Sequence, residues 1–340
     1  MYRIILFLGF ILFYSCEKDP YHDGLYHSYK GKFVYVDREE NKYVIVTFAA
    51  DVSRQITNTD RDRFSPQWFP DGKHIMYLSN DQGKLYIHVM DDRGHNDHSL
   101  IQVNKSSIST IFYPVIHLSP DGKFVVQDRA DSVIIYSVNE EFNFNRIASF
   151  NCTTDYKSLI WAPDSKKFSC ACPGADSVRH LNVYDLGTGQ INDYTKFLGH
   201  DVHDQSWSYN SSLIAFISSY DIYLINANGT GLHKIVTTSN FLEARLSFSP
   251  FDNRIIYERA DSLSDLVMYD VDTRNTNILI EDKKSIEGPL LWVEDGKYVF
   301  YAYGQETFKT QEFRLFDIEV RKNHTITYDR LKGVNYINEE

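Results

Sequence analysis

The segment His117-Leu118-Ser119-Pro120-Asp121-Gly122-Lys123, followed by Phe124-Val125-Val126, decides the fold of this chain. It combines a large apolar residue, a small residue, a Pro-Asp-Gly turn and a hydrophobic run, a pattern that predicts two β-strands joined by a tight turn. Five further segments share the pattern, at 67–73, 160–166, 206–211, 247–253 and 291–297, and a degenerate copy lies at 29–32. The chain is therefore built from a repeat.

The spacing of the repeat identifies the repeating unit. The equivalent turn positions 31, 72, 122, 165, 211, 253 and 296 are separated by 41, 50, 43, 46, 42 and 43 residues. A period in the low forties with short strands is typical of a four-stranded propeller blade. A hydrophobic second strand follows each of the seven turns, so we expect an all-β, seven-bladed β-propeller of four-stranded antiparallel blades.

One position of the repeat holds every tryptophan of the chain. The 4 tryptophans all stand directly before the turn, where the other two copies have a leucine and a phenylalanine: Trp68, Trp161, Trp207 and Trp292. Large aromatic side chains at one equivalent position fit the layer between neighbouring blades. We expect them to be structural and not to bind a ligand.

Three segments carry a resemblance to a known family. The Ser-Pro-Asp-Gly-Lys turn at 119–123, the third strand Tyr86–Asp91 and the ending Arg-Gln-Ile-Thr at 54–57 resemble the repeats of TolB-like propellers, and the resemblance spans roughly residues 29–330. It implies protein–protein contacts in the cell envelope. Six blades are usual in that family, so a six-bladed ring is the alternative to seven.

One blade also resembles a WD-type repeat. The matching residues are Tyr184-Asp185, Gly199-His200 and Trp207, with Asp221 in the following turn. The resemblance implies that His200 bonds Asp221 and rigidifies the blade, so we interpret both residues as structural.

The first and last units raise the question of ring closure. The first unit lacks a clear innermost strand, whereas the last has a spare apolar segment, Val334–Ile337. Pairing of this segment into the first blade would remove an exposed sheet edge. The alternative is that Leu25–Tyr29 supplies the missing strand.

The N-terminus has the pattern of an export signal. Arg3 is followed by the apolar run Ile4–Phe13 and then by Ser15-Cys16, which resembles a bacterial lipobox whose cysteine is acylated. We expect a lipoprotein signal peptide at 1–15, a lipidated tether at 16–28 and the propeller at 29–340. The alternative is an ordinary signal peptide with an unrelated cysteine.

The predicted location follows from this pattern. The acidic tether that begins at Glu17 resembles the surface-export signal of lipoproteins in the Bacteroides group. We expect the protein in the cell envelope, anchored to the outer membrane through Cys16, on the periplasmic or the surface-exposed side.

Charge and cysteine content exclude several classes of protein. The net charge of −11 becomes −12 when residues 1–15, which hold Arg3 and no acid, are removed, so nucleic acid is not an expected partner. Cys170 and Cys172 lie two apart on one predicted strand, too close for a mutual disulfide. Cys152 could bridge to either in an oxidising envelope. Buried thiols that pack as small apolar residues are the alternative that we favour.

The candidate site is the mouth of the central channel, where the repeats stop agreeing. Residues just before each innermost strand should line this mouth, and function in repeat scaffolds resides in such variable positions. We expect ligand contacts from Arg63, Tyr113, Tyr156, Lys157, His203, Asp204, Glu243 and Glu287.

Within that set, one group has metal-binding chemistry. His203, Asp204, Glu243 and Glu287 come from three successive blades, and their oxygen-rich donors would suit calcium or manganese. Some seven-bladed propellers that cleave uronate-containing sugars use histidine-rich metal sites in this region. The chain does not supply three histidines at matching positions, so no metal or other cofactor is predicted.

Motifs of other enzyme classes do not occur. The chain has no Gly-x-Ser-x-Gly, no His-Glu-x-x-His and no phosphate-binding glycine loop, and we do not expect the propeller–hydrolase arrangement of prolyl peptidases. The sequence favours a non-catalytic envelope lipoprotein that binds a protein, peptide or glycan at the channel mouth. The alternative is a metal-dependent enzyme that resembles polyuronate lyases.

Overall fold

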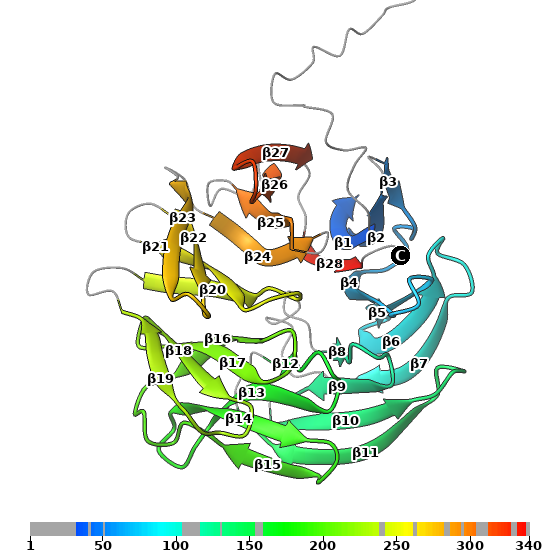
Figure 1. Ribbon diagram of the computed structural model, residues 1–340. Coiled ribbons are helices and arrows are strands. Elements are labelled where there is room, and N and C mark those ends of the chain that lie inside the picture. Colours follow the sequence, from blue (N-terminus) through cyan, green and yellow to red (C-terminus); the bar gives the residue numbers. More distant parts are fainter. Residues whose placement is uncertain are drawn as a thin grey trace, which may run out of the picture.

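The structure is all-β. The computed structural model describes residues 32–39, 42–49, 52–103, 116–129, 131–153, 159–237, 242–260, 264–281, 286–293, 296–303, 312–327 and 332–337. In these ranges every regular element is a strand, and seven four-stranded antiparallel sheets surround a central axis (Figure 1). The described residues include no helix with the length and apolar character of a membrane span. The predicted seven-bladed propeller is confirmed, and the six-bladed alternative is wrong.

Six blades are continuous in sequence and run outward from an innermost strand. Blades 2 to 4 contain β4 (Arg63–Trp68), β5 (His74–Asp81), β6 (Lys84–Asp91) and β7 (His98–Val103); β8 (Ile116–Leu118), β9 (Phe124–Asp128), β10 (Ser132–Val138) and β11 (Phe144–Asn151); and β12 (Ile160–Trp161), β13 (Lys167–Pro173), β14 (Arg179–Asp185) and β15 (Gln190–Asp193). Blades 5 to 7 contain β16 (Val202–Trp207), β17 (Leu213–Ser218), β18 (Asp221–Asn226) and β19 (His233–Val236); β20 (Leu242–Phe248), β21 (Arg254–Ala260), β22 (Ser264–Asp270) and β23 (Asn275–Glu281); and β24 (Ile286–Val293), β25 (Tyr298–Tyr303), β26 (Glu312–Asp317) and β27 (Lys322–Thr327).

Blade 1 joins the two ends of the described chain. It contains β28 (Lys332–Ile337), β1 (Lys32–Glu39), β2 (Lys42–Ala49) and β3 (Val52–Gln55) in that order. β28 pairs antiparallel with β1, with Ile337 opposite Lys32 and Tyr336 opposite Phe33, and it lies on the channel side of the blade (Figure 1). The predicted closure by the C-terminal segment is confirmed, and Leu25–Tyr29 lies outside the described residues.

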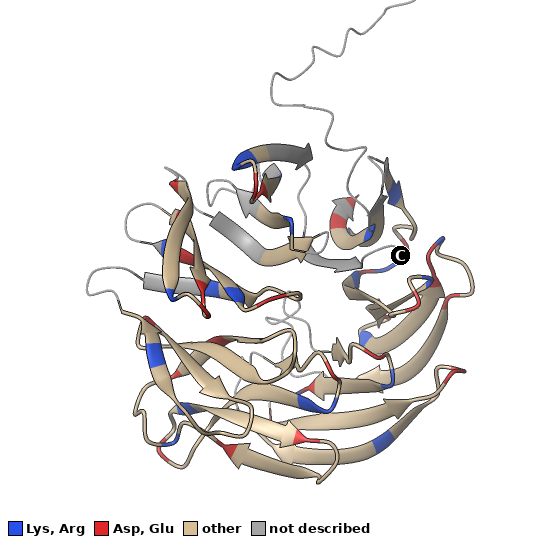
Figure 2. Ribbon diagram, viewed as in Figure 1, with Lys and Arg blue, Asp and Glu red and all other residues tan. Residues whose placement is uncertain are grey.

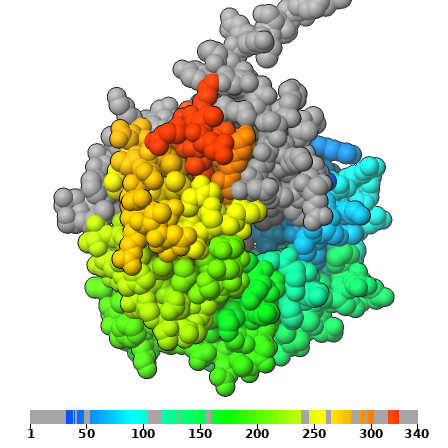
Figure 3. All heavy atoms as spheres, viewed as in Figure 1, coloured from blue at the N-terminus to red at the C-terminus, as the bar shows by residue number. Residues whose placement is uncertain are grey.

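The core of the molecule lies between the blades. The described residues form six clusters of buried apolar side chains, and each takes its members from two neighbouring blades. Figure 2 shows the charged residues mainly in turns and at strand ends, and Figure 3 shows the blades packed side by side around the ring. Burial between blades is what makes a ring of sheets stable, because a single blade cannot bury its own faces.

The tryptophans belong to these interfaces, as predicted. All four are buried. The indole of Trp161 donates to the carbonyl of His117 at 3.1 Å, and that of Trp292 donates to the carbonyl of Ser247 at 3.2 Å, both in the preceding blade. Trp207 donates instead to Ser169 Oγ at 3.0 Å, again across the blade boundary. Each of these three side chains thus adds a directed bond to the apolar contact.

The Pro-Asp-Gly turns also connect blades. Gly122 has a φ of +71°, and a Cβ at this position would lie 2.9 Å from Pro70 in the turn of blade 2, so glycine is required there. Blades 4 and 5 place Ser165 and Ser211 at the equivalent position, both with a φ of 59°. Ser165 Oγ accepts a hydrogen bond from the backbone N–H of Asp121 at 3.0 Å, a contact across the blade boundary that offsets the left-handed backbone.

The cysteine prediction is corrected by the structure. Cys152 and Cys172 form a disulfide with an S–S distance of 2.10 Å, and Cys170 is a buried free thiol. Cys152 follows the outer strand of blade 3 and Cys172 lies in β13 of blade 4, so the bond joins neighbouring blades. The favoured expectation of buried unpaired thiols is wrong for Cys152 and Cys172, and the alternative of a bridge from Cys152 is confirmed. The distance between adjacent blades, which decides between the two, is not visible in a repeat pattern.

The WD-type prediction for blade 5 is also corrected. In the described part of the chain Asp221 forms an ion pair with Lys234 at 2.5 Å and makes no bond with His200. His200 is exposed, and its backbone carbonyl accepts a hydrogen bond from Ser218 Oγ at 3.3 Å. Lys234 lies on the adjacent strand β19 and satisfies the carboxylate from there, so the histidine is not needed in this role.

Candidate functional site

The innermost strands share a bulge near the channel mouth, which we define as the end where these strands begin. The pairing of β4, β16, β20 and β24 with the following strand is interrupted at one equivalent place, for example between His203 and Ser206. Ser65, Asp204 and Arg245 occupy this place with φ values of 50°, 45° and 50°. A bulge bends a strand and re-aims its side chains. The bulge therefore changes which residues face the mouth.

His203 and Asp204 form a polar pair at this mouth. His203 Nδ1 lies 3.0 Å from Asp204 Oδ2, and both side chains are partly exposed. The left-handed backbone of Asp204 turns its carboxylate toward the neighbouring imidazole, an arrangement that a regular strand with alternating side chains would not allow. The two predicted site residues are thus brought together, and each satisfies part of the other's hydrogen bonding.

The next blade presents an ion pair that the sequence did not single out. The Arg245 guanidinium bonds the carboxylate of Glu258, which also accepts a hydrogen bond from Ser264 Oγ at 2.7 Å. Glu258 is buried, so the pair anchors the bulge of β20 to the strand beside it. A carboxylate held this way is engaged with the protein itself.

Glu243 and Glu287 are placed by their backbone alone. Glu243 lies in β20 opposite Arg259, and Glu287 lies in β24 opposite Ala302. Their side chains fall outside the described residues, as do Tyr113, Tyr156, Lys157 and Cys16. The predicted roles of these six residues stay predictions.

Arg63 is structural in position. Its side chain is only 4% exposed, and the guanidinium donates to the carbonyl of Asn58 at 2.8 Å and pairs with Asp60 at 2.9 Å. Partial burial acts to raise the pKa of Asp60, but hydrogen bonds and charge from Arg61 and Arg63 outweigh it and hold this pKa below its ordinary value. Arg63 therefore supports the loop that enters blade 2, and its guanidinium group points into the protein.

The described residues do not form a metal centre. No group of three or more histidine, cysteine, aspartate or glutamate side chains in these ranges could hold a metal ion. Of the proposed metal-binding group, only His203 and Asp204 have described side chains.

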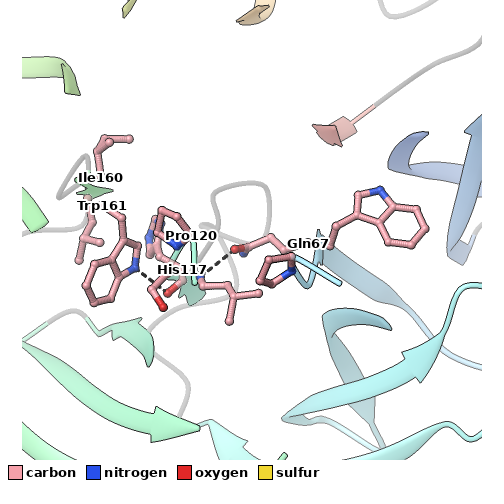
Figure 4. A pocket seen from close by; sticks show the side chains of 10 residues that line it. Gln67, His117, Pro120, Ile160 and Trp161 are labelled. Carbon is pink, nitrogen blue, oxygen red and sulfur yellow. Dashed lines mark hydrogen bonds between the residues drawn. The ribbon is translucent and has the colours of Figure 1, made fainter. Parts of the chain in front are cut away.

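A hollow lies at the opposite end of the channel, beside the Pro-Asp-Gly turns. It has a volume of about 430 Å³ and is bounded by the ends of the innermost strands of blades 2, 3 and 4 (Figure 4). Gln67 bridges two of these strands, since its amide donates to the carbonyl of Ile116 at 2.6 Å and accepts from the N–H of Leu118 at 2.9 Å. The wall of the hollow is formed by Gln67, Trp68, Pro70, His117, Leu118, Ser119, Pro120, Leu159, Ile160 and Trp161.

This hollow was not predicted. The sequence placed its residues in the repeat and its turns, and nothing in the repeat pattern shows that three adjacent strand ends leave a space. The signal that was available is the residue directly before the tryptophan position, which changes from Gln67 to His117 to Ile160.

Comparison with known proteins supports the fold. No protein-family model matches the chain, and no curated protein matches it in sequence. Among solved structures, TolB from Acinetobacter baumannii is 16% identical with a TM-score of 0.53, over 90% of this chain and 66% of TolB. The β-propeller domain of the Trilobed protease from Pyrococcus furiosus is 15% identical with a TM-score of 0.63, over 87% and 94%. An oligogalacturonate lyase in complex with manganese is 15% identical with a TM-score of 0.61, over 87% and 85%.

These likenesses define a class of architecture. The chain spans less than two thirds of the length of the TolB structure, so the shared part is the propeller. The fold is that of a TolB-like β-propeller, as the turn and strand motifs indicated. Propellers with this architecture serve as binding scaffolds and as enzyme domains, so function must be argued from the site.

Proposed function

We propose that this protein is a non-catalytic lipoprotein of the cell envelope, whose TolB-like propeller binds a protein, peptide or glycan at the central channel. One observation carries the proposal. The polar side chains that differ between blades at the mouth are engaged with one another, as in His203 with Asp204 and Arg245 with Glu258. Side chains held in such pairs have a fixed position, which suits the recognition of a ligand. A catalytic acid or base must instead be placed to exchange a proton with a substrate.

The anchor rests on the N-terminal sequence. The apolar run Ile4–Phe13 ending at Ser15-Cys16 supports export and acylation of Cys16. The test is metabolic labelling with an alkyne fatty acid in cells that express the wild type or Cys16→Ala. The label should be lost, and the protein released from the membrane fraction, in the variant. Equal labelling would refute acylation at this residue.

Binding at the mouth is tested with the mature protein. Protein lacking residues 1–15 is immobilised and exposed to solubilised envelope extract, and the same protein is titrated calorimetrically with neutral and uronate oligosaccharides. The double variant His203→Ala, Asp204→Ala should lose the ligand that the wild type binds. His233→Ala, at an exposed position of the outer strand β19, is the control. A ligand retained by the double variant would show that the mouth is not the site.

The second candidate function is a metal-dependent polyuronate lyase. It is supported by the likeness in fold to a lyase that holds manganese and by the pairing of His203 with Asp204 near the start of an innermost strand. Metal analysis after incubation with Mn²⁺ should then find about one equivalent, lost in His203→Ala, and unsaturated products should form from oligogalacturonate. Metal-free protein whose melting temperature is unchanged by chelator would remove this candidate.

A further inference from the structure

The turn that joins β17 to β18 places an aromatic residue where the backbone disfavours one. Ser218 pairs with Asp221, so the turn consists of Ser219 and Tyr220, with φ values of 52° and 69°. Two successive positive φ values define a type I′ hairpin turn, whose positions favour asparagine and glycine. A bulky residue in the left-handed region is an outlier that costs conformational energy.

Blade 2 shows that the scaffold accommodates glycine at this place. Asp81 pairs with Lys84 across the equivalent turn, which consists of Gln82 and Gly83 with φ values of 52° and 84°. A Cβ at Gly83 would meet no atom within 4 Å, so the choice there is a matter of backbone conformation and not of space. Tyr220 is 57% exposed, so burial of its ring does not offset the unfavourable backbone.

A second exposed aromatic residue lies at the same end of blade 5. Phe197 is 69% exposed, the largest exposed fraction among the large apolar residues of the described chain. It belongs to the loop that enters β16 and lies inside a turn closed by the N–H of Leu198 and the carbonyl of Thr195 at 2.9 Å. The same loop is tied to the Tyr220 hairpin, because Ser218 Oγ donates to the carbonyl of His200 at 3.3 Å. Both rings therefore lie on the mouth side of the propeller, outside the channel.

The surroundings of these rings are acidic. Asp176 precedes β14, Asp193 ends β15 and Asp201 precedes β16, so all three lie at this end. Arg179, the first residue of β14, pairs with Asp201, and His180 bonds both Asp176 and Asp193. The loop that enters β16 also carries Lys196. Partial burial acts to raise the pKa of Asp201, but hydrogen bonds from Arg179 outweigh it, so this pKa lies below its ordinary value. Asp204 and Asp221 add two carboxylates at this end and Lys234 adds one cation, so five carboxylates stand against three Lys and Arg cations. The chain as a whole has a net charge of −11.

We propose that Tyr220 and Phe197 form a docking surface for a protein segment that carries arginine or lysine side chains. Exposed aromatic faces attract cations, and tyrosine is enriched where protein surfaces bind one another. The acidic surroundings add long-range attraction for a basic segment and disfavour a polyanion. The surface lies outside the channel, so it stands whether or not a ligand binds there.

The experiment uses the mature propeller and a fluorescent peptide of alternating arginine and serine, with fluorescence anisotropy as the readout. The double variant Tyr220→Gly, Phe197→Ala should bind the peptide about three- to ten-fold more weakly than the wild type. Tyr220→Gly alone should raise the melting temperature by roughly 1–3 °C, because it relieves the left-handed backbone. If Tyr220 serves binding at a cost in stability, its replacement should raise the melting temperature and weaken peptide binding together.

Two matched variants control for nonspecific attraction. Gly83→Tyr places the same residue in the equivalent turn of blade 2 and should lower the melting temperature without changing peptide affinity. Tyr209→Ala with Phe251→Ala removes two exposed aromatic residues from the turns at the other end of blades 5 and 6 and should bind like the wild type.

Three results would overturn the proposal. The first is equal peptide affinity in all variants. The second is loss, in Tyr220→Gly, of binding to a neutral oligosaccharide with peptide binding retained, which would assign the surface to sugars. The third is a dimer in sedimentation that Tyr220→Gly dissociates, which would assign it to a second copy of the chain. The channel variant His203→Ala, Asp204→Ala should leave peptide binding intact, so the two proposals fail separately.

Discussion

Replacing Gln205 with leucine removes a buried amide from the interface between blade 5 and the preceding blade. Gln205 is 4% exposed, and neither Oε1 nor Nε2 has a hydrogen-bond partner in the structure. The equivalent position of the other innermost segments is apolar and buried in Ile116, Leu159, Leu246 and Leu290. Blade 5 therefore has an amide where four other blades pack a hydrocarbon side chain.

The expected magnitude follows from the cost of an unsatisfied polar group. Each buried donor or acceptor without a partner costs about 1–3 kcal/mol, and a shape-matched apolar replacement recovers that cost. Gln205→Leu should therefore raise the free energy of unfolding by about 1–3 kcal/mol, reduced by any misfit of the branched side chain. Gln205→Met keeps the unbranched shape and should give a gain of similar size.

Urea denaturation followed by tryptophan fluorescence measures this difference, because all four tryptophans lie between blades. The reciprocal variant Leu246→Gln should lower the free energy of unfolding by about 2–4 kcal/mol, since it inserts an amide into the core between blades 5 and 6. If Gln205→Leu and Gln205→Met both destabilise by 1 kcal/mol or more, the amide has a partner in solution and the reasoning is refuted.

Three further predictions concern the ring and its charges. Cys152→Ala should lower the free energy of unfolding by about 3 kcal/mol, the chain-entropy value for a disulfide between residues 20 apart. Reductant should lower the free energy of unfolding of the wild type by the same amount. An unchanged urea midpoint in both the variant and the reduced wild type would contradict this prediction. Deleting Lys332–Ile337 should expose the edge of β1 and cause aggregation in light scattering, whereas removing only the last three residues should not; a monomeric, cooperatively unfolding deletion variant would show that β28 does not close the ring. Burial acts to raise the pKa of Asp97, but hydrogen bonds from His88 and Tyr77 outweigh it and lower this pKa. The contribution of Asp97 to stability is therefore present above about pH 4, the pKa of the unfolded chain, and is lost as the pH falls through the lower pKa of the folded protein. Asp97→Asn should reduce the change of the urea midpoint with pH between pH 2 and 5. An equal pH dependence in the variant and the wild type would exclude this role of Asp97.

The local repeat was readable from the sequence because each blade uses the same short-range chemistry. A Pro-Asp-Gly turn between hydrophobic runs identifies a hairpin without reference to the rest of the chain. Its recurrence gave the number of blades, the interface position of Trp161 and the spare segment that becomes β28. Ring closure was predictable because an unpaired strand edge is unfavourable and one apolar segment was left over.

The candidate site was predicted less well, since its geometry depends on contacts between blades. His203 and Asp204 were predicted as ligand contacts, and the structure shows that the two side chains pair with each other; their role toward a ligand stays a prediction. The burial of Arg63 was not predicted, because its partners in the loop at 58–61 become its neighbours only once the loop is folded. The missed feature is the bulge shared by four innermost strands, which a period-two pattern cannot express.

The sequence by itself determined the number of blades, their four-stranded antiparallel build and the position of the tryptophans between blades. It could do so because these properties follow from residue type and from spacing of a few residues. The tertiary structure alone decided that Cys152 bonds Cys172, that Lys234 and not His200 bonds Asp221, and that Gln205 is buried without a partner. It also decided that Tyr220 stands in a left-handed turn on the mouth side. The physical reason is that the disulfide and the burial of Gln205 depend on how neighbouring blades pack, whereas the Asp221–Lys234 pair and the turn at Tyr220 depend on strand register and backbone conformation. Residue type and repeat spacing encode none of these.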